Sequence, residues 1–235
     1  MIFLLPFLIA EPSQDLLQKI EENLYPAQKE MSIRFVVHKK KRSKDYTLIL
    51  RQKDQQSSVV FHTPARDRGT KYLREKNGIW MYIPSLENVE KITGHMLQQG
   101  IMGSELSYED LMNQSNPLSK DYKIISRTEE KDHTQECIQI SLKARFDHIP
   151  YAQKEMCVHP EYYIPLHEKW FSPTGILLKE WIRTEIKIID NIPTPHKIEI
   201  RDSLHTNRKT VIYINMISYT NHIKDDFFSR RWLER

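Results

Sequence analysis

The chain has 235 residues, 28% of them charged, and a formal net charge of +4. This length suits one domain whose core is large enough to enclose a cavity. The mild charge excess does not by itself indicate a nucleic-acid partner, which would require a strongly basic face. Twelve prolines, scattered among many short β-rich runs, favour an antiparallel β architecture.

Residues 1–10 are almost entirely apolar. This run is too short to cross a bilayer as a helix, which takes about 20 residues. It matches the apolar region of a secretory signal with Ala10 at the cleavage position, although no Lys or Arg precedes it. An apolar arm packed on the domain would have the same composition. We expect export, with residues 1–10 as a short or truncated signal peptide and residues 11–235 as a single domain.

Residues 13–25 are predicted to form an amphipathic helix. Ser13 follows a proline and is the expected N-cap, and Pro26 marks the end of the helix. The apolar side chains recur at helical spacing and form one stripe, made of Leu16, Leu17, Ile20 and Leu24.

From Ile33 the apolar pattern changes to a period of two, which indicates strands. Ile33, Phe35 and Val37 share one face, and the same alternation recurs at Tyr46, Leu48 and Leu50. The basic residues between them, in 38–44, are predicted at a hairpin tip. Such a tip is either a solvated turn or a docking point for acidic lipid head groups or a partner protein. Nucleic acid is not predicted, because no recognition helix or stacking motif accompanies it.

Further strands or hairpins are predicted along the rest of the chain. A polar loop is expected at 113–120, and the turn of the hairpin after it at 129–133. Ile182, Ile186 and Ile188 are expected to keep one strand face apolar. The predicted strands and hairpins are 57–62, 69–76, 122–128, 134–142, 154–158, 162–179, 182–188, 198–200 and 211–216.

The stretch 67–111 organises the chain. Trp80 and Tyr82 share one face of a strand whose other face carries Met81 and Ile83, so this strand must be covered on both sides. Pro84 ends it, because proline has no N–H to donate.

A glycine-rich loop with two methionines follows at 94–103 and suits an adaptable apolar surface. Ser107 and Asp110 have the spacing of a capping box that opens a short helix. The adjacent pair Glu109–Asp110 is not predicted to be catalytic, because neighbouring helix positions point in different directions. These acids are expected to orient the loop and cap its helix.

Three ordered motifs in this stretch resemble those of the LolA-like outer-membrane lipoprotein-sorting family. They are a D-R-G-T strand start at 67–70, W-x-Y-x-P-x-L at 80–86, and M-G-S-x-x-S-Y-E-D-L at 102–111. Weaker likenesses at 162–179 and 225–233 extend the resemblance over most of the chain. The first motif has one residue fewer than the family pattern, and the basic run usual after the second is replaced by 88–92.

The resemblance implies an α+β fold: a strongly curved, incompletely closed antiparallel β-barrel with helices over its concave face. It also implies a periplasmic, non-enzymatic carrier of lipid or lipoprotein acyl chains, without a cofactor. An inner-membrane transporter or outer-membrane acceptor is the expected partner, and a monomer is expected. The motif residues given a structural role are Asp67, Arg68, Gly69, Thr70, Pro84, Gly103, Ser104, Tyr108, Glu109 and Asp110.

The acyl-chain site is expected in the stretch that carries the motifs. Each buried CH₂ contributes about 0.8 kcal/mol, so two or three chains would bind tightly without polar chemistry. The alternative for the same side chains is a collapsed, dry core. The expected lining residues are Trp80, Tyr82, Met96, Leu97, Ile101, Met102 and Leu106.

The two cysteines lie on predicted neighbouring strands. If those strands are antiparallel and turn near Asp147, Cys137 and Cys157 lie opposite one another and can form a disulfide. A slip of one residue in the register would leave two free thiols. An even cysteine count is typical of exported proteins.

No catalytic or metal motif is recognisable in the sequence. Ten histidines include no H-x-x-x-H pair, and C-x-x-C, G-x-S-x-G, P-loop and Rossmann patterns are absent. No metal site is therefore predicted. Two other classes stay open: a periplasmic adaptor for a membrane transporter without lipid cargo, and a hydrolase of lipid-like substrates, for which no nucleophile is recognisable.

Overall fold

The computed structural model describes residues 12–76, 78–113, 117–132, 135–219 and 222–235. The predicted signal region, 1–10, lies outside these residues. Within them one antiparallel sheet of 13 strands runs in the order β6-β5-β4-β3-β2-β1-β13-β12-β11-β10-β9-β8-β7. Consecutive strands are neighbours, except that β6 and β7 lie at opposite ends of the sheet. The two halves of the chain meet where β1 pairs with β13.

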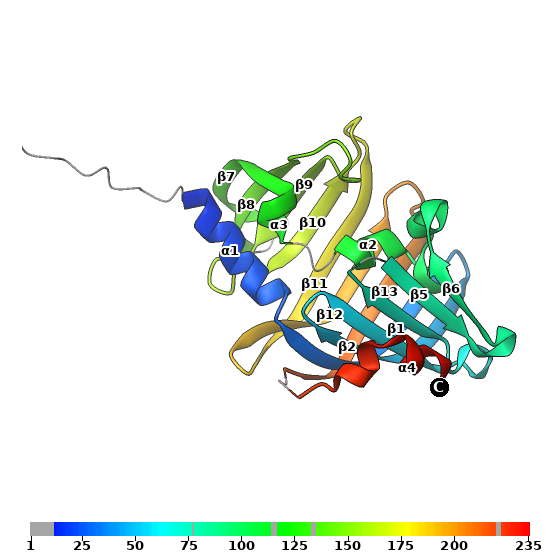
Figure 1. Ribbon diagram of the computed structural model, residues 1–235. Helices are drawn as coiled ribbons and strands as arrows, with labels where there is room; N and C mark the ends of the chain where they lie inside the picture. The colour runs from blue at the N-terminus through cyan, green and yellow to red at the C-terminus, as the bar shows by residue number, and fades with distance from the viewer. Residues whose placement is uncertain (1–11, 77, 114–116, 133–134, 220–221) are drawn as a thin grey trace, which may run out of the picture.

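The sheet is strongly curved and stays open, since β6 and β7 lie at its two ends in the described part of the chain (Figure 1). The predicted incompletely closed barrel is confirmed. The strands are β1 (Gln28–Lys39), β2 (Arg42–Lys53), β3 (Gln56–Thr63), β4 (Lys71–Glu75), β5 (Gly78–Ile83), β6 (Asn88–Ile92), β7 (Tyr122–Asp132), β8 (Gln135–Ala144), β9 (Gln153–Val158), β10 (Pro165–Phe171), β11 (Leu177–Ile189), β12 (Ile192–Asp202) and β13 (Arg208–Ser218).

Helices and short 3₁₀ turns fill and flank the curved sheet. In Figure 1, α1 and α3 lie at one end of the sheet and α2 lies nearer its middle. The α-helices are α1 (Pro12–Leu24), α2 (Tyr108–Asn113), α3 (Leu118–Asp121) and α4 (Arg230–Glu234). The 3₁₀ turns are η1 (Ala65–Asp67), η2 (Pro84–Leu86), η3 (Gly94–Gln98), η4 (Ile101–Gly103) and η5 (Asp225–Phe228).

The predicted stripe of α1 packs on the end of the sheet formed by β7, β8 and β9. Leu16, Leu17 and Ile20 are buried in one cluster with Ile140 and Met156. The helix begins at Pro12, so Ser13 lies within it and not at the predicted N-cap position.

The hairpin of β1 and β2 has the predicted alternation. Ile33 pairs with Leu48 and Phe35 with Tyr46, and these side chains are buried in the largest core cluster. The tip of the hairpin turns at Lys40, which has a positive φ of 53°, so the basic residues of 39–42 are exposed.

A row of aromatic rings crosses the concave face of the sheet and ends on α2. It runs through Phe35, Tyr46, Phe61, Tyr72 and Tyr108, with successive ring centroids 6.2, 5.6, 6.0 and 5.6 Å apart. Edge-to-face and tilted pairs at these distances stabilise a core beyond their buried area. The row therefore fixes α2 against four strands.

Strand β5 is covered on both faces, as predicted. Ile79 and Met81 belong to the concave core, whereas Trp80 and Tyr82 belong to a cluster with the C-terminal segment. Arg230 of α4 lies 3.1 Å from the centroid of the Trp80 ring. The C-terminal residues thus close the outer side of this strand.

Several sequence predictions differ from the structure in extent. The stretch at 88–92 forms an extra strand, β6, and the predicted polar loop at 113–120 contains α3. Strand β7 continues to Asp132, so the predicted turn residues 129–132 are part of the strand. On β11 the buried side chain is Trp181, while Ile188 is 50% exposed.

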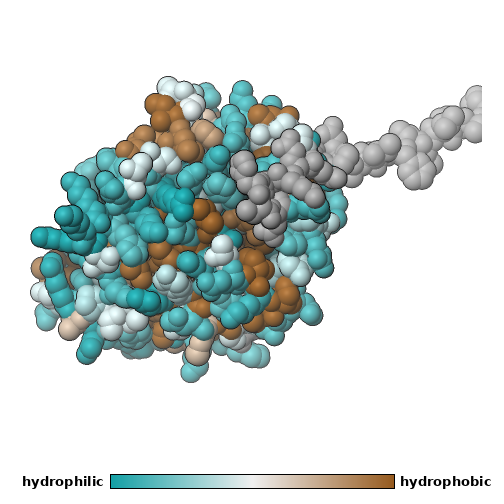
Figure 2. All heavy atoms as spheres, turned by 180° about the vertical axis from the view of Figure 1, so that it is seen from behind, coloured by the Kyte–Doolittle hydropathy of each residue, from teal (hydrophilic) through white to brown (hydrophobic). Residues whose placement is uncertain are grey.

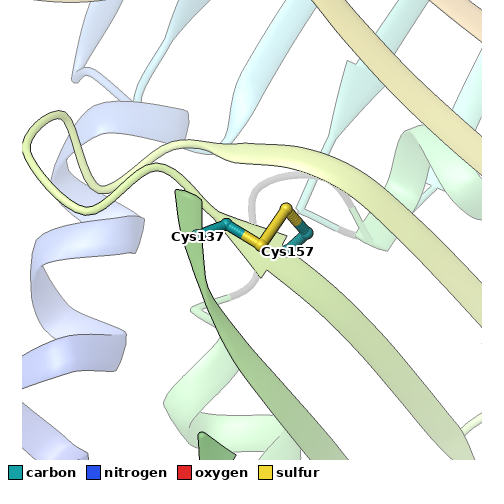
Figure 3. The surroundings of a disulfide bond; sticks show 2 residues. All are labelled: Cys137 and Cys157. Atoms are coloured by element: carbon teal, nitrogen blue, oxygen red, sulfur yellow. A yellow bond between two sulfur atoms is a disulfide. The ribbon is translucent and has the colours of Figure 1, made fainter. Parts of the chain in front are cut away.

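A disulfide joins Cys137 and Cys157 across β8 and β9 (Figure 3). Their Cα atoms are 5.5 Å apart and both side chains are buried. The direct ladder partner of Cys157 is Gln139, so the two cysteines lie on a diagonal and not opposite one another.

We expect the double substitution Cys137→Ala and Cys157→Ala to lower the free energy of unfolding by about 3 kcal/mol. The bond closes a loop with a sequence separation of 20, and loops of this size give about that loss of unfolded-state entropy. Urea unfolding of the oxidised protein and of the variant measures the difference. Equal stabilities would contradict this expectation.

Candidate functional site: an interior cavity

A cavity of about 230 Å³ lies between the concave face of the sheet and the segments that cover it. Its walls include side chains of β1, β2, β3, β9, β10, β11, β12 and β13, and its cover comes from the end of α1, from α3 and from residues 101–111. Figure 2 shows hydrophobic side chains gathered in the middle of one face of the molecule, among hydrophilic ones. The apolar lining includes Met31, Ile33, Phe35, Leu48, Leu50, Val59, Phe61, Ile198, Ile212, Ile214 and Ile217.

Strand alternation places these side chains on one surface. Ile198 pairs with Ile212 across β12 and β13, and Ile212 pairs with Phe35 across β13 and β1. Leu50, Ile198 and Ile212 face inwards and yet are only half-buried, because they border empty space. The arrangement suits hydrocarbon, which needs area and no specific polar partner.

The cover segment 100–111 is held in place by its own backbone geometry. The N–H of Ile101 donates to the carbonyl of Leu106 at 2.8 Å. A Cβ at Gly100 would lie 1.7 Å from the carbonyl oxygen of Ser104, so glycine is required there.

Asp110 anchors this segment to the sheet. The N–H of Ser107 donates to Asp110 Oδ2 at 2.9 Å and the N–H of Asp110 to Ser107 Oγ at 3.0 Å, which is the predicted capping box. The hydroxyl of Tyr151 donates to Asp110 Oδ1 at 2.7 Å, and Lys179 of β11 donates to its other oxygen. A fully buried carboxylate therefore links the loop to β11.

The predicted lining residues fall into three groups. Ile101 and Leu106 line the cavity. Met96, Leu97 and Met102 are partly buried against the same core without lining the cavity. Trp80 and Tyr82 lie on the other face of β5.

The motif residues keep the neighbouring chain segments together. Gly69 has a φ of +79°, and a Cβ there would lie 3.1 Å from Pro84 Cγ, so the first two motifs touch. Thr70 and Ser104 are buried, and the hydroxyl of Ser104 donates to the carbonyl of Leu106 at 3.1 Å. Gly103 also has a positive φ, of 74°.

Sequence reasoning missed a group of buried charges at one end of the cavity. Arg183 Nη1 donates to Glu168 Oε1 at 2.5 Å, and Trp170 Nε1 donates to the other oxygen at 2.9 Å. Lys154 lies 4.0 Å from the centroid of the Trp170 ring. The available signal was the spacing: Glu168 and Trp170, like Trp181 and Arg183, are two residues apart on one strand face.

The charges in this group shift one another's pKa. Burial by itself would raise the pKa of Glu168, but the positive charges of Arg183 and Lys154 and the hydrogen bonds from Trp170 and Arg183 lower it below its usual value of 4.5. Burial lowers the pKa of the Lys154 ammonium, and the charges of Glu168 and Asp110 partly oppose this shift.

The lowered pKa of Glu168 predicts a pH dependence. The ionised carboxylate stabilises the fold above the unfolded pKa, and this stabilisation is lost as the pH falls below 4.5 through the folded pKa. We therefore expect the native protein to lose stability more steeply than Glu168→Gln as the pH falls below 4.5. Urea midpoints measured at several pH values test this, and parallel curves would contradict it.

The described residues lack two further features. No group of three His, Cys, Asp or Glu side chains there could hold a metal ion. No helix in the described ranges is long and apolar enough to span a membrane.

A family model described only as "uncharacterized protein" matches residues 53–235. The chain belongs to this family. Three solved structures show that its fold is LolA-like, which confirms the resemblance seen in the sequence motifs. No curated protein matches the chain.

The first of these structures is a putative outer membrane lipoprotein-sorting protein domain from Vibrio parahaemolyticus: 18% identity, TM-score 0.80, covering 96% of this chain and 100% of that one. A DUF1329 family protein from Desulfovibrio piger is 20% identical, with a TM-score of 0.84 and coverage of 93% and 96%. The LolA superfamily protein NE2245 from Nitrosomonas europaea is 17% identical, with a TM-score of 0.76 and coverage of 94% and 98%.

Proposed function

We propose that this protein is an exported, non-enzymatic carrier that holds an acyl chain in the interior cavity and moves it across the periplasm. The observation that carries the proposal is the apolar cavity under a cover of short helices and turns. The likeness to a putative lipoprotein-sorting domain supports it at the level of the fold.

The size of the cavity limits how much cargo fits without movement. At about 230 Å³ it lies below the range of roughly 300–1,000 Å³ usual for small-molecule sites. We propose that one chain, or part of one, enters this form and that the 101–111 cover moves to admit more. Of the residues expected to line the site from the sequence, Ile101 and Leu106 then contact the cargo directly.

We expect Ile212→Asp to abolish binding of a neutral fluorescent acyl probe. A carboxylate placed on the apolar floor would be buried beside hydrocarbon, which is strongly unfavourable. Leu204→Asp is the matched control, because Leu204 is 59% exposed and lies outside the cavity lining. Circular dichroism establishes that both variants are folded. Unchanged probe binding by Ile212→Asp would contradict the proposal.

The exposed hairpin tip between β1 and β2 supports a docking role within the same proposal. Lys39, Lys40, Lys41, Arg42 and Lys44 are all exposed. We propose that this tip contacts an acidic surface on a transporter or acceptor. The same contact would serve an adaptor without lipid cargo, and absence of acyl-probe binding would favour that alternative.

A further inference from the structure

One end of the apolar cavity carries polar groups that hydrocarbon does not need. Lys29 begins the inward-facing series on β1 that continues with Met31, Ile33 and Phe35. Its direct ladder partner on β2 is Gln52, which also lines the cavity. Tyr219 lines the cavity as well, and its hydroxyl lies 2.7 Å from Thr194 Oγ1.

Lys29 is half-buried and lines the cavity, and the described residues place no countercharge beside its ammonium. Among the described residues no ion pair or hydrogen bond to its Nζ occurs, and burial is the sole influence on its pKa, which it lowers to about 8. A cation that is partly withdrawn from water is stabilised when an anion pairs with it.

The other charged groups of the cavity differ from Lys29 in this respect. Arg183 is paired with Glu168, and Asp110 is paired with Lys179. The negative charges of Glu168 and Asp110 favour the charged form of Lys154. Among the charged lining residues of the described chain, Lys29 is the one for which no ion pair, hydrogen bond or neighbouring charge is found.

We propose that Lys29 binds the anionic head group, a carboxylate or a phosphate, of the amphiphile whose acyl chain occupies the apolar part of the cavity. Gln52 and Tyr219 are positioned to add hydrogen bonds to the same head group. This inference rests on the proposed carrier function and adds a preference to it: an anionic single-chain lipid binds better than a neutral one with the same chain.

The test compares three ligands that share one acyl chain: oleate, oleoyl lysophosphatidate and the neutral mono-olein. Each displaces a neutral fluorescent acyl probe from the full-length protein. We expect at least one of the two anions to displace the probe at a concentration about tenfold lower than mono-olein, since a charge-assisted hydrogen bond of this kind contributes that much. Stronger displacement by oleate would indicate a carboxylate head group, and stronger displacement by lysophosphatidate would indicate a phosphate.

Lys29→Met should remove the preference, so that the two anions and mono-olein displace the probe from this variant at similar concentrations. Lys187→Met is the matched control, because Lys187 is exposed on β11 and outside the cavity lining, and it should keep the preference. Thermal unfolding establishes that both variants are folded. Equal displacement by all three ligands, or a preference that survives in Lys29→Met, would overturn the inference and leave the carrier proposal standing. Failure of all three ligands to displace the probe would overturn both.

Discussion

Replacing Glu168 with alanine is expected to lower the free energy of unfolding by about 3–5 kcal/mol. The side chains of Glu168 and Arg183 are 3% and 9% exposed, so the substitution leaves a buried guanidinium without its partner. It also removes the acceptor of the Trp170 indole N–H. Urea unfolding followed by far-ultraviolet circular dichroism measures the loss without relying on the nearby tryptophans.

The control for this prediction is Glu199→Ala. Glu199 pairs with Arg201 and Lys209, whose side chains are 50% and 45% exposed, and such pairs contribute under about 1 kcal/mol. Similar small losses in both variants would show that the Glu168 pair is not buried as described.

Asp110→Ala is expected to release the cover of the cavity. The substitution removes the acceptor for Lys179, for the Tyr151 hydroxyl and for the Ser107 N–H. We expect a loss of about 3 kcal/mol, because a half-buried cation and two buried donors lose their acceptor. Hydrogen exchange in residues 100–111 should accelerate more than exchange in the β1–β13 ladder.

Asp15→Ala is the matched control for the cover. Asp15 is 65% exposed and pairs with Lys19 one helical turn away, a contact of a few tenths of a kcal/mol. Its exchange pattern should match that of the unaltered protein. Unchanged exchange at 100–111 in Asp110→Ala would contradict the anchoring role.

The general fold could be predicted because local patterns and ordered motifs agree. Alternation at Ile33, Phe35 and Val37 gave the right buried face. The capping box at Ser107 and Asp110 could be read from spacing alone, since both hydrogen bonds form within one helical turn.

The face of β5 could not be assigned from its own sequence. Trp80 and Tyr82 have large aromatic side chains and Ile79 and Met81 have aliphatic ones, and either pair could have packed on the concave side. The C-terminal segment decides, because it covers Trp80 and Tyr82 from a position about 150 residues later in the chain. A local pattern shows that both faces are covered but not which one borders a cavity.

The buried charged residues could also not be predicted from local sequence patterns. Glu168 and Arg183 meet because β10 and β11 pair, and Asp110 meets Lys179 across the cavity cover. On a sequence, such residues resemble the alternating charges of a solvated strand. Lys29 is similar, since its inward direction follows from the register that pairs it with Gln52.

The most direct test of acyl-chain binding is photocrosslinking with a fatty acid that carries a diazirine near its tail, followed by peptide mapping. The carrier proposal predicts crosslinks on the concave faces of β1, β2 and β13, at residues such as Ile33, Leu50 and Ile212. Crosslinks confined to exposed apolar side chains such as Leu204 and Met216, or none above background, would contradict it.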